Sequence, residues 1–228
     1  MMINKTFIIL VFSLAFISLQ VYAQDILTAG KFFDTLSVSY GNIEDYEARI
    51  SIVTDEALME GILFYKSPNL LRINFSKPED QVISVNNDVL TLHIPDQNVV
   101  MQQTLKRHSN AALAAMASKQ GLELLKKGYS IAFLKGPDPI PLDEGSEELV
   151  TKLKLVWRQT DEGYRQIEMS ISEDGMIRRM KGITVNYDTF QFDFTEIKIN
   201  QSIPVSRFDY EAPPSAYAMN NFLFEPEQ

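Results

Sequence analysis

The chain has 228 residues, a formal net charge of −9 at pH 7 and no cysteine. Without cysteine, disulfides, thiolate nucleophiles and cysteine metal sites are excluded. The negative charge disfavours binding to nucleic acid or to an anionic membrane surface, because the phosphate term would be repulsive.

The first 23 residues predict an exported protein. They contain one cation, Lys5, an apolar run at 7–19 and the small-residue ending Val21-Tyr22-Ala23. This order is typical of a cleaved secretory signal peptide. A retained membrane anchor is the alternative, but the run is shorter than the ~20 residues of a spanning helix. We expect cleavage after residue 23, a net charge of −10 once Lys5 is removed, and one soluble periplasmic domain over 24–228.

Residues 25–40 are predicted to form a helix. Apolar residues recur there at spacings of three and four, namely Ile26, Ala29, Phe33, Leu36 and Tyr40. Gly41-Asn42 follows as a stop signal. Residues 46–53 then alternate in polarity, and we expect this strand to pair with 58–65.

Residues 60–96 show the clearest pattern in the chain, short runs that alternate at period two between turn residues. Their apolar positions are Ile62, Phe64, Leu71, Ile73, Phe75, Leu90, Leu92 and Ile94. The turns are expected at Ser67-Pro68-Asn69, Lys77-Pro78 and Asn86-Asn87-Asp88. The pattern predicts an antiparallel meander with one apolar face, followed by one more short strand at 98–103.

The period changes after the meander. Residues 109–127 are predicted to form short helical segments, with Ser109-Asn110 as a possible cap. Residues 129–134 are apolar and β-like. Residues 135–146 hold three prolines and two glycines, so they are predicted to form a loop.

Strand patterns return from residue 148. The apolar positions are Leu153, Leu155, Trp157, Ile167, Met169, Ile171, Phe190, Phe192 and Phe194, with a further strand at 176–185. Ile197 and Ile199 have the opposite parity to the three phenylalanines, which predicts a bulge near Thr195. The tail at 213–228 is expected either to be disordered or to lie across an apolar surface.

The order of elements predicts a mainly β (α+β) fold. One strongly curved antiparallel sheet, an unclosed β-barrel, would be covered on its concave face by the N-terminal helix and by a short helical lid at 109–127. We expect no division into further domains, since the sequence has no Gly/Ser linker and no internal repeat.

The sequence contains little that indicates catalysis. Its two histidines, His93 and His108, have no second ligand at metal-binding spacing, and we interpret them as surface or capping residues. The acidic pairs are adjacent, so on a strand they would point to opposite faces and make poor acid/base partners. No catalytic residue, metal or cofactor is predicted, and we do not expect an enzyme.

Apolar surface is abundant, with fourteen Phe, nine Met and nine Tyr. An ordinary core is one interpretation of this abundance. The other is a cavity for an apolar ligand, since methionine and aromatic rings adapt to flexible chains.

Several motifs together indicate a family. They are Gly61-Ile62-Leu63-Phe64-Tyr65-Lys66-Ser67-Pro68-Asn69, Leu71-Arg72-Ile73, Lys77-Pro78-Glu79-Asp80-Gln81, Asn87-Asp88, His93-Ile94-Pro95-Asp96, Arg165-Gln166-Ile167-Glu168-Met169, Asp174-Gly175-Met176-Ile177 and Phe208-Asp209-Tyr210-Glu211-Ala212-Pro213. With them the chain resembles the LolA group, the periplasmic carriers of outer-membrane lipoproteins. Three positions depart from the family pattern: Ser67 replaces the arginine thought to tether the lid, Asn87-Asp88 replaces Asp-Gly, and Ile94 replaces an aromatic residue.

The resemblance implies a half-barrel capped by helices, with acyl chains held in between. The residues expected to line the acyl cavity are Phe64, Ile73, Phe75, Leu90, Leu92, Trp157, Met169, Phe192 and Phe194. The residues expected under the lid are Leu113, Met116, Leu122 and Leu125. Parity alone does not say which face is concave, so any of these strands can be reversed as a whole.

The implied function is carriage of lipoproteins from the inner to the outer membrane by a monomer. The implied partners are acylated lipoproteins, the inner-membrane transporter that releases them and, where one exists, an outer-membrane acceptor. Two alternatives use the same half-barrel: an envelope sensor that regulates a membrane partner, and a binder of glycolipid or phospholipid.

Overall fold

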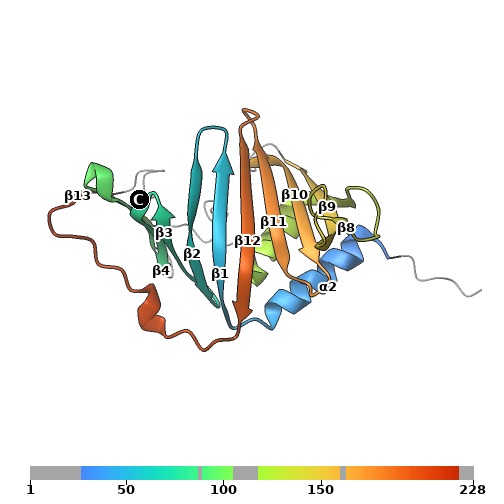
Figure 1. Ribbon diagram of the computed structural model, residues 1–228, viewed down its shortest axis with the longest axis horizontal. Coiled ribbons are helices and arrows are strands. Elements are labelled where there is room, and N and C mark those ends of the chain that lie inside the picture. Colours follow the sequence, from blue (N-terminus) through green and yellow to red (C-terminus); the bar gives the residue numbers. More distant parts are fainter. Residues whose placement is uncertain (1–26, 87–88, 105–117, 160–162, 221–228) are drawn as a thin grey trace, which may run out of the picture.

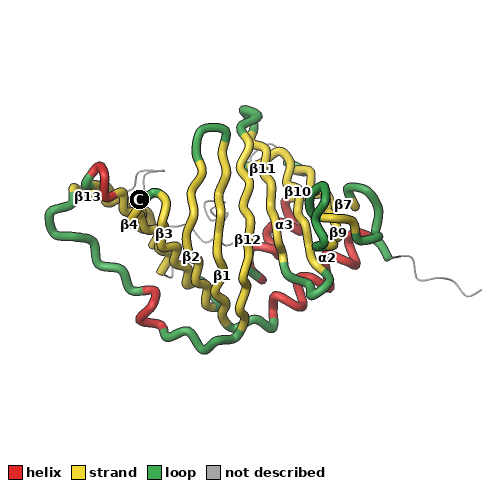
Figure 2. The backbone as a smooth tube through the Cα atoms, viewed as in Figure 1, coloured by secondary structure: helices red, strands yellow, loops and turns green. Residues whose placement is uncertain are grey.

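The structure is a computed structural model, and it describes residues 27–86, 89–104, 118–159 and 163–220. The predicted signal peptide and most of the predicted lid, with Leu113 and Met116, lie outside these ranges. Within them, one large curved sheet carries two α-helices on one side (Figures 1 and 2). The predicted mainly β class with a single curved sheet is confirmed.

The elements follow the predicted order. They are α2 (Ala29–Gly41), β1 (Asp45–Thr54), β2 (Leu58–Lys66), β3 (Leu70–Lys77), β4 (Glu79–Asn86), β5 (Val89–Ile94), η1 (Pro95–Gln97), β6 (Val99–Thr104), α3 (Lys119–Gly128), β7 (Tyr129–Phe133), β8 (Ile140–Pro141), β9 (Leu149–Trp157), β10 (Tyr164–Ser172), β11 (Ile177–Thr184), β12 (Thr189–Ile199), η3 (Val205–Phe208) and β13 (Tyr217–Asn220). The short strand β8 lies inside the stretch predicted to be a loop.

The sheet consists of two meanders joined along one seam. Across the sheet the strands lie in the order β13-β6-β5-β4-β3-β2-β1-β12-β11-β10-β9-β7, and β8 pairs with β9. The seam is the antiparallel pair β1–β12. Among the described strands β13 alone pairs in parallel, with β6.

A bulge in the seam explains the change of parity in β12. The register of β1 against β12 shifts between Glu47 and Arg49, and Glu196 has a positive φ of 50°. Because of this extra residue, Ile199 pairs with Tyr46 on the same face on which Phe192 and Phe194 pair with Ile52 and Ile50. The bulge predicted near Thr195 is confirmed.

Both described helices begin at a capping hydroxyl. Thr28 Oγ1 accepts from Lys31 N at 3.2 Å, and Ser118 Oγ accepts from Gly121 N at 3.1 Å, which satisfies an otherwise unpaired donor at each helix start. The predicted helix at 25–40 is confirmed from residue 29 onward. Neither of these two helices is long and apolar enough to cross a membrane.

The main hydrophobic core lies between the helices and the sheet. Four side chains of α2 are buried in it, namely Ala29, Phe33, Leu36 and Tyr40, and α3 adds Leu122 and Leu125. We call this side of the sheet the inner face; it contains the cross-strand row Ala48, Leu63 and Ile73. The outer face is the opposite side, with Phe64 and Arg72.

After β12 the chain leaves the sheet and crosses the outer face. In Figure 1 this segment runs around one end of the strands and returns to the far edge as β13. On the way it forms a second hydrophobic cluster with the sheet, made of Phe64, Leu70, Ile203 and Phe208. The tail was expected either to be disordered or to lie across an apolar surface. Its described part, 213–220, ends in a strand paired with β6, which does not support disorder.

Candidate functional site

Most residues predicted to line an acyl cavity lie together on the inner face. Five of them are buried in the main core: Ile73, Phe75, Met169, Phe192 and Phe194. Trp157 is partly buried against the same cluster. These side chains share one hydrophobic cluster with residues of α2 and α3, so they already belong to a closed core.

Leu90 and Leu92 also lie on the inner face, but they are less covered. The register pairs Ile73 with Ile83, Ile83 with Leu92, and Leu92 with Met101. Ile83, Leu90, Leu92 and Met101 are all only partly buried. The inner face therefore continues from the closed core into a partly accessible, mainly apolar surface over β4, β5 and β6. The polar Gln103, which pairs with Leu90, is buried within it.

Phe64 is a correction to the predicted lining. It pairs with Arg72, so it lies on the outer face, where it packs with Phe208 and Ile203. Its neighbours Leu63 and Tyr65 face the main core instead. Three consecutive apolar residues made the parity of this strand ambiguous.

Polarity and burial are reversed over β4 and β5. On the outer face Ser84, Thr91 and His93 are only 3%, 8% and 7% exposed. On the inner face the apolar Val85, Leu90 and Leu92 remain partly exposed. Burial normally favours the apolar side chains of a strand, so this part of the inner face leaves apolar side chains accessible that a core would ordinarily cover.

The C-terminal segment accounts for the buried polar side chains. Ser84 Oγ donates to the carbonyl of Phe208 at 3.2 Å, and Tyr210 Oη lies 2.6 Å from His93 Nδ1. Arg72 Nη1 donates to the carbonyls of residues 207 and 209 at 3.2 and 2.8 Å. Burial lowers the pKa of Arg72 from its ordinary value. His93, interpreted from sequence as a surface or capping residue, is in fact buried in this contact.

The residues of β6 were missed in the sequence-based prediction of the lining. Met101 lies beside Leu92, and Val99 lies beside Ile94. The signal was present, since 98–103 was predicted to be a strand, but its parity relative to β5 depends on the register. Only the register assigns Met101 to the inner face.

Other parts of the described surface suit an acyl chain less well. A groove of about 500 Å³ near β1, β2, β3 and β12 is lined in part by the polar side chains Arg49, Glu60, Asn74 and Asp193. Within the described ranges, no group of three His, Asp or Glu side chains could hold a metal ion.

The sequence matches the family described as Outer membrane lipoprotein carrier protein LolA over residues 53–211. The chain belongs to this LolA family. The resemblance inferred from the turn and strand motifs is thereby confirmed.

Solved structures share the fold of this LolA-family chain at low sequence identity. An uncharacterized conserved protein from Thermus thermophilus has a TM-score of 0.55 and 12% identity, over 84% of this chain and 98% of that one. A crystal structure of MucB gives 0.53 and 10%, over 84% and 65%. The Pseudomonas aeruginosa MucA/MucB complex gives 0.50 and 10%, over 81% and 61%. A search among curated proteins found no match.

The turn at Ser67, where the resemblance led us to expect a departure from the family pattern, lies beside a contact to α3. Lys66, which precedes Ser67, turns to the outer face, where it contacts Asp45 at 3.3 Å and the carbonyl of Ile203 at 2.9 Å. Tyr65 points to the inner face instead. Its hydroxyl lies 3.3 Å from both the carbonyl of Pro68 and Oε1 of Gln120. Burial raises the pKa of Tyr65, which keeps this hydroxyl protonated as a donor.

Replacing Tyr65 with phenylalanine should loosen α3 without unfolding the sheet. The lost hydrogen bond is worth about 0.5–1.5 kcal/mol, and we expect faster amide hydrogen exchange at Leu122 and Leu125 by a corresponding factor. The exposed Tyr187, at 69% exposure, provides the control Tyr187→Phe, which should leave exchange in α3 unchanged. Equal exchange in both variants would show that Tyr65 does not hold the helix.

Proposed function

We propose that this LolA-family chain is a periplasmic carrier that binds the acyl chains of lipoproteins on the inner face of β4, β5 and β6. The observation that carries the proposal is the reversed burial over β4 and β5: apolar side chains of the inner face stay accessible, while polar side chains of the outer face are covered. On β6, Met101 continues the accessible inner face, although Gln103 beside Leu90 is buried. The family match supports lipoprotein as the cargo.

The energetics of an acyl chain favour such a surface. Burying a chain is worth ~0.8 kcal/mol per CH₂, so exposing a long chain to water costs on the order of 10 kcal/mol. The inner face of β9 and β10 is already filled, since Leu153, Leu155 and Met169 are 0% exposed. A ligand would therefore bind where the core is still open, next to Leu92 and Met101.

The proposed transport route follows from the same chemistry. The predicted signal peptide would deliver the chain to the periplasm, an inner-membrane transporter would release the lipoprotein to it, and an outer-membrane acceptor would receive the cargo. The carrier needs no catalytic step, because each transfer only exchanges one apolar environment for another. We propose no catalytic role for His93, which is engaged with Tyr210.

The adjacent residues Met101 and Gln102 allow a matched test. Met101 is on the inner face, whereas Gln102 is exposed and pairs with Thr91 of the outer face. Met101→Glu should weaken binding of a fluorescent palmitoyl probe at least tenfold, because a charge beside the chain must be desolvated. Gln102→Glu should leave the dissociation constant unchanged. Wild-type affinity in Met101→Glu, with the fold intact by circular dichroism, would refute this site.

Native mass spectrometry of the protein purified from its own periplasm tests the cargo. An acylated lipoprotein in the bound fraction supports the proposed carriage. A free phospholipid or glycolipid alone would overturn lipoprotein as the cargo and favour the lipid-binding alternative. A ligand-free protein that also takes up no palmitoyl probe would refute acyl binding altogether.

A further inference from the structure

The C-terminal strand β13 extends the inner face beyond β6. Its register pairs Tyr217 with Val99 and Met219 with Met101. Since Met101 pairs with Leu92, Met219 continues the inner-face row. The row then runs across four neighbouring strands and is made of Ile83, Leu92, Met101 and Met219.

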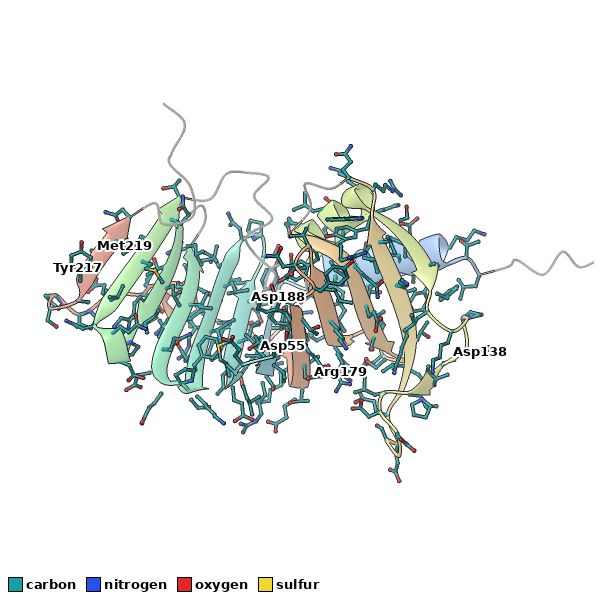
Figure 3. The ribbon with its side chains drawn as sticks, turned by 90° about the horizontal axis from the view of Figure 1, so that it is seen from above. Asp55, Asp138, Arg179, Asp188, Tyr217 and Met219 are labelled. Carbon is teal, nitrogen blue, oxygen red and sulfur yellow. The ribbon has the colours of Figure 1, made fainter. Side chains whose placement is uncertain are left out.

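All side chains of β13 are exposed, so the strand is not held by packing of its side chains. Tyr217 is 67% exposed and Met219 is 43% exposed. The strand is positioned through its backbone instead: Tyr217 N donates to the carbonyl of Asn98 at 2.8 Å, and Asn98 Nδ2 donates to the carbonyl of Ser215 at 2.8 Å. A tyrosine and a methionine are thus held at the edge of the sheet without packing into the core (Figure 3).

This edge of the sheet is also uncharged. The sequences of β5, β6 and β13 contain no Asp, Glu, Lys or Arg, although the chain has 30 acidic and 21 basic residues. Exposed edge strands are commonly protected by charged side chains. An apolar, uncharged edge therefore suits contact with an apolar ligand.

The dimensions match one acyl chain. Neighbouring strands lie about 4.8 Å apart, so three spacings from β4 to β13 cover roughly 14 Å. A bilayer's hydrocarbon core is about 30 Å thick, so a chain of one leaflet is about 15 Å long. A chain lying across the strands would reach from Ile83 to Met219.

We infer that β13 is the outer rim of the acyl-binding surface, with one chain of the cargo lying across the strands along Ile83, Leu92, Met101 and Met219. This inference rests on the proposed function and assigns the orientation of the ligand and the role of the C-terminal strand. Tyr217, beside Val99, covers the chain's outer end. Short chains bind without β13, whereas long chains need it.

Two fluorescent probes, octanoyl and palmitoyl, test the inference on the full mature chain. Met219→Glu should weaken palmitoyl binding about tenfold, the loss expected when two methylenes are no longer buried, and should change octanoyl binding less than twofold. Ala218→Glu is the matched control on the same strand, because successive side chains point to opposite faces. It should leave both affinities unchanged.

Leu92→Glu serves as the reference, because it lies at the centre of the site and should weaken both probes. If Leu92→Glu weakens binding and Met219→Glu does not, the role of β13 is refuted and the proposed function stands. If neither variant changes the affinity of a folded protein, the proposed function itself fails. Equal losses of palmitoyl affinity in Ala218→Glu and Met219→Glu would show that release of β13 from β6 is responsible. That result would also overturn the proposed role of β13 as the rim of the surface.

Discussion

Replacing Asp45 with alanine is expected to lower the free energy of unfolding by about 3–5 kcal/mol, the cost of breaking a buried ion pair. Asp45 is 1% exposed. Its carboxylate accepts from the backbone N–H of Gln201 at 2.7 Å and of Ile203 at 3.0 Å, and it contacts Lys66 at 3.3 Å. Alanine would leave two backbone donors without their acceptor, and Lys66 would keep only the carbonyl of Ile203. Urea denaturation of both proteins gives the difference directly.

The same strand supplies the control for Asp45. Glu47 also pairs with a lysine, Lys198, at 3.3 Å, but the two side chains are 34% and 59% exposed. Solvent-exposed ion pairs contribute little, so Glu47→Ala should cost less than about 1 kcal/mol. Equal losses of stability in the two variants would show that the hydrogen bonds of Asp45 to Gln201 and Ile203 do not hold the C-terminal segment in place. Limited proteolysis around residue 203 should be faster in Asp45→Ala than in Glu47→Ala.

Replacing Gly61 with alanine is the second change with a large expected effect. A Cβ at this position would lie 2.4 Å from the carbonyl oxygen of Asn74 and 2.9 Å from Cα of Phe75. Both are backbone atoms of β3, at a place where the register of β2 against β3 shifts. Since neither can move as a flexible side chain would, we expect a loss of about 3 kcal/mol or more from overpacking, seen as a lower melting temperature.

Gly163 is the matched control for Gly61. No heavy atom lies within 4 Å of the position its Cβ would take, so Gly163→Ala should stay within about 0.5 kcal/mol of the wild type. A Gly61→Ala variant with unchanged melting temperature would mean that β2 and β3 can separate at little cost.

The alternating patterns predicted the strands well because they depend only on neighbouring residues. Leu71, Ile73 and Phe75 share the inner face as their spacing indicates, and the bulge at Glu196 follows from the parity change after Phe194. The predicted face of Phe64 was wrong because both faces of β2 are buried at this residue. Its outer face is covered by Phe208, a residue 144 positions later in the sequence, which no local pattern could reveal.

Local sequence patterns also could not predict how much of each side chain is buried. Alternation indicates which side chains share a face, but it does not say what covers that face. Met169 is fully buried, while Leu92 on the same inner face remains partly exposed. That difference, which defines the candidate site, follows the placement of α2 and α3, which contact β7 at the opposite edge of the sheet. Both depend on contacts between distant parts of the chain.

The seam between β1 and β12 has a consequence for how the chain reaches this structure. Hairpins within each meander join neighbouring segments and can form early, but the hydrogen bond from Glu44 N to Asn200 Oδ1 beside the seam joins residues 156 positions apart. Closing a loop of this length costs more entropy than closing a hairpin. Because β13 spans residues 217–220, the far edge of the apolar face can be completed only after the chain has been made beyond residue 220. A partly synthesised or partly exported chain would therefore carry an unfinished apolar surface, open to premature association with lipid or with other chains.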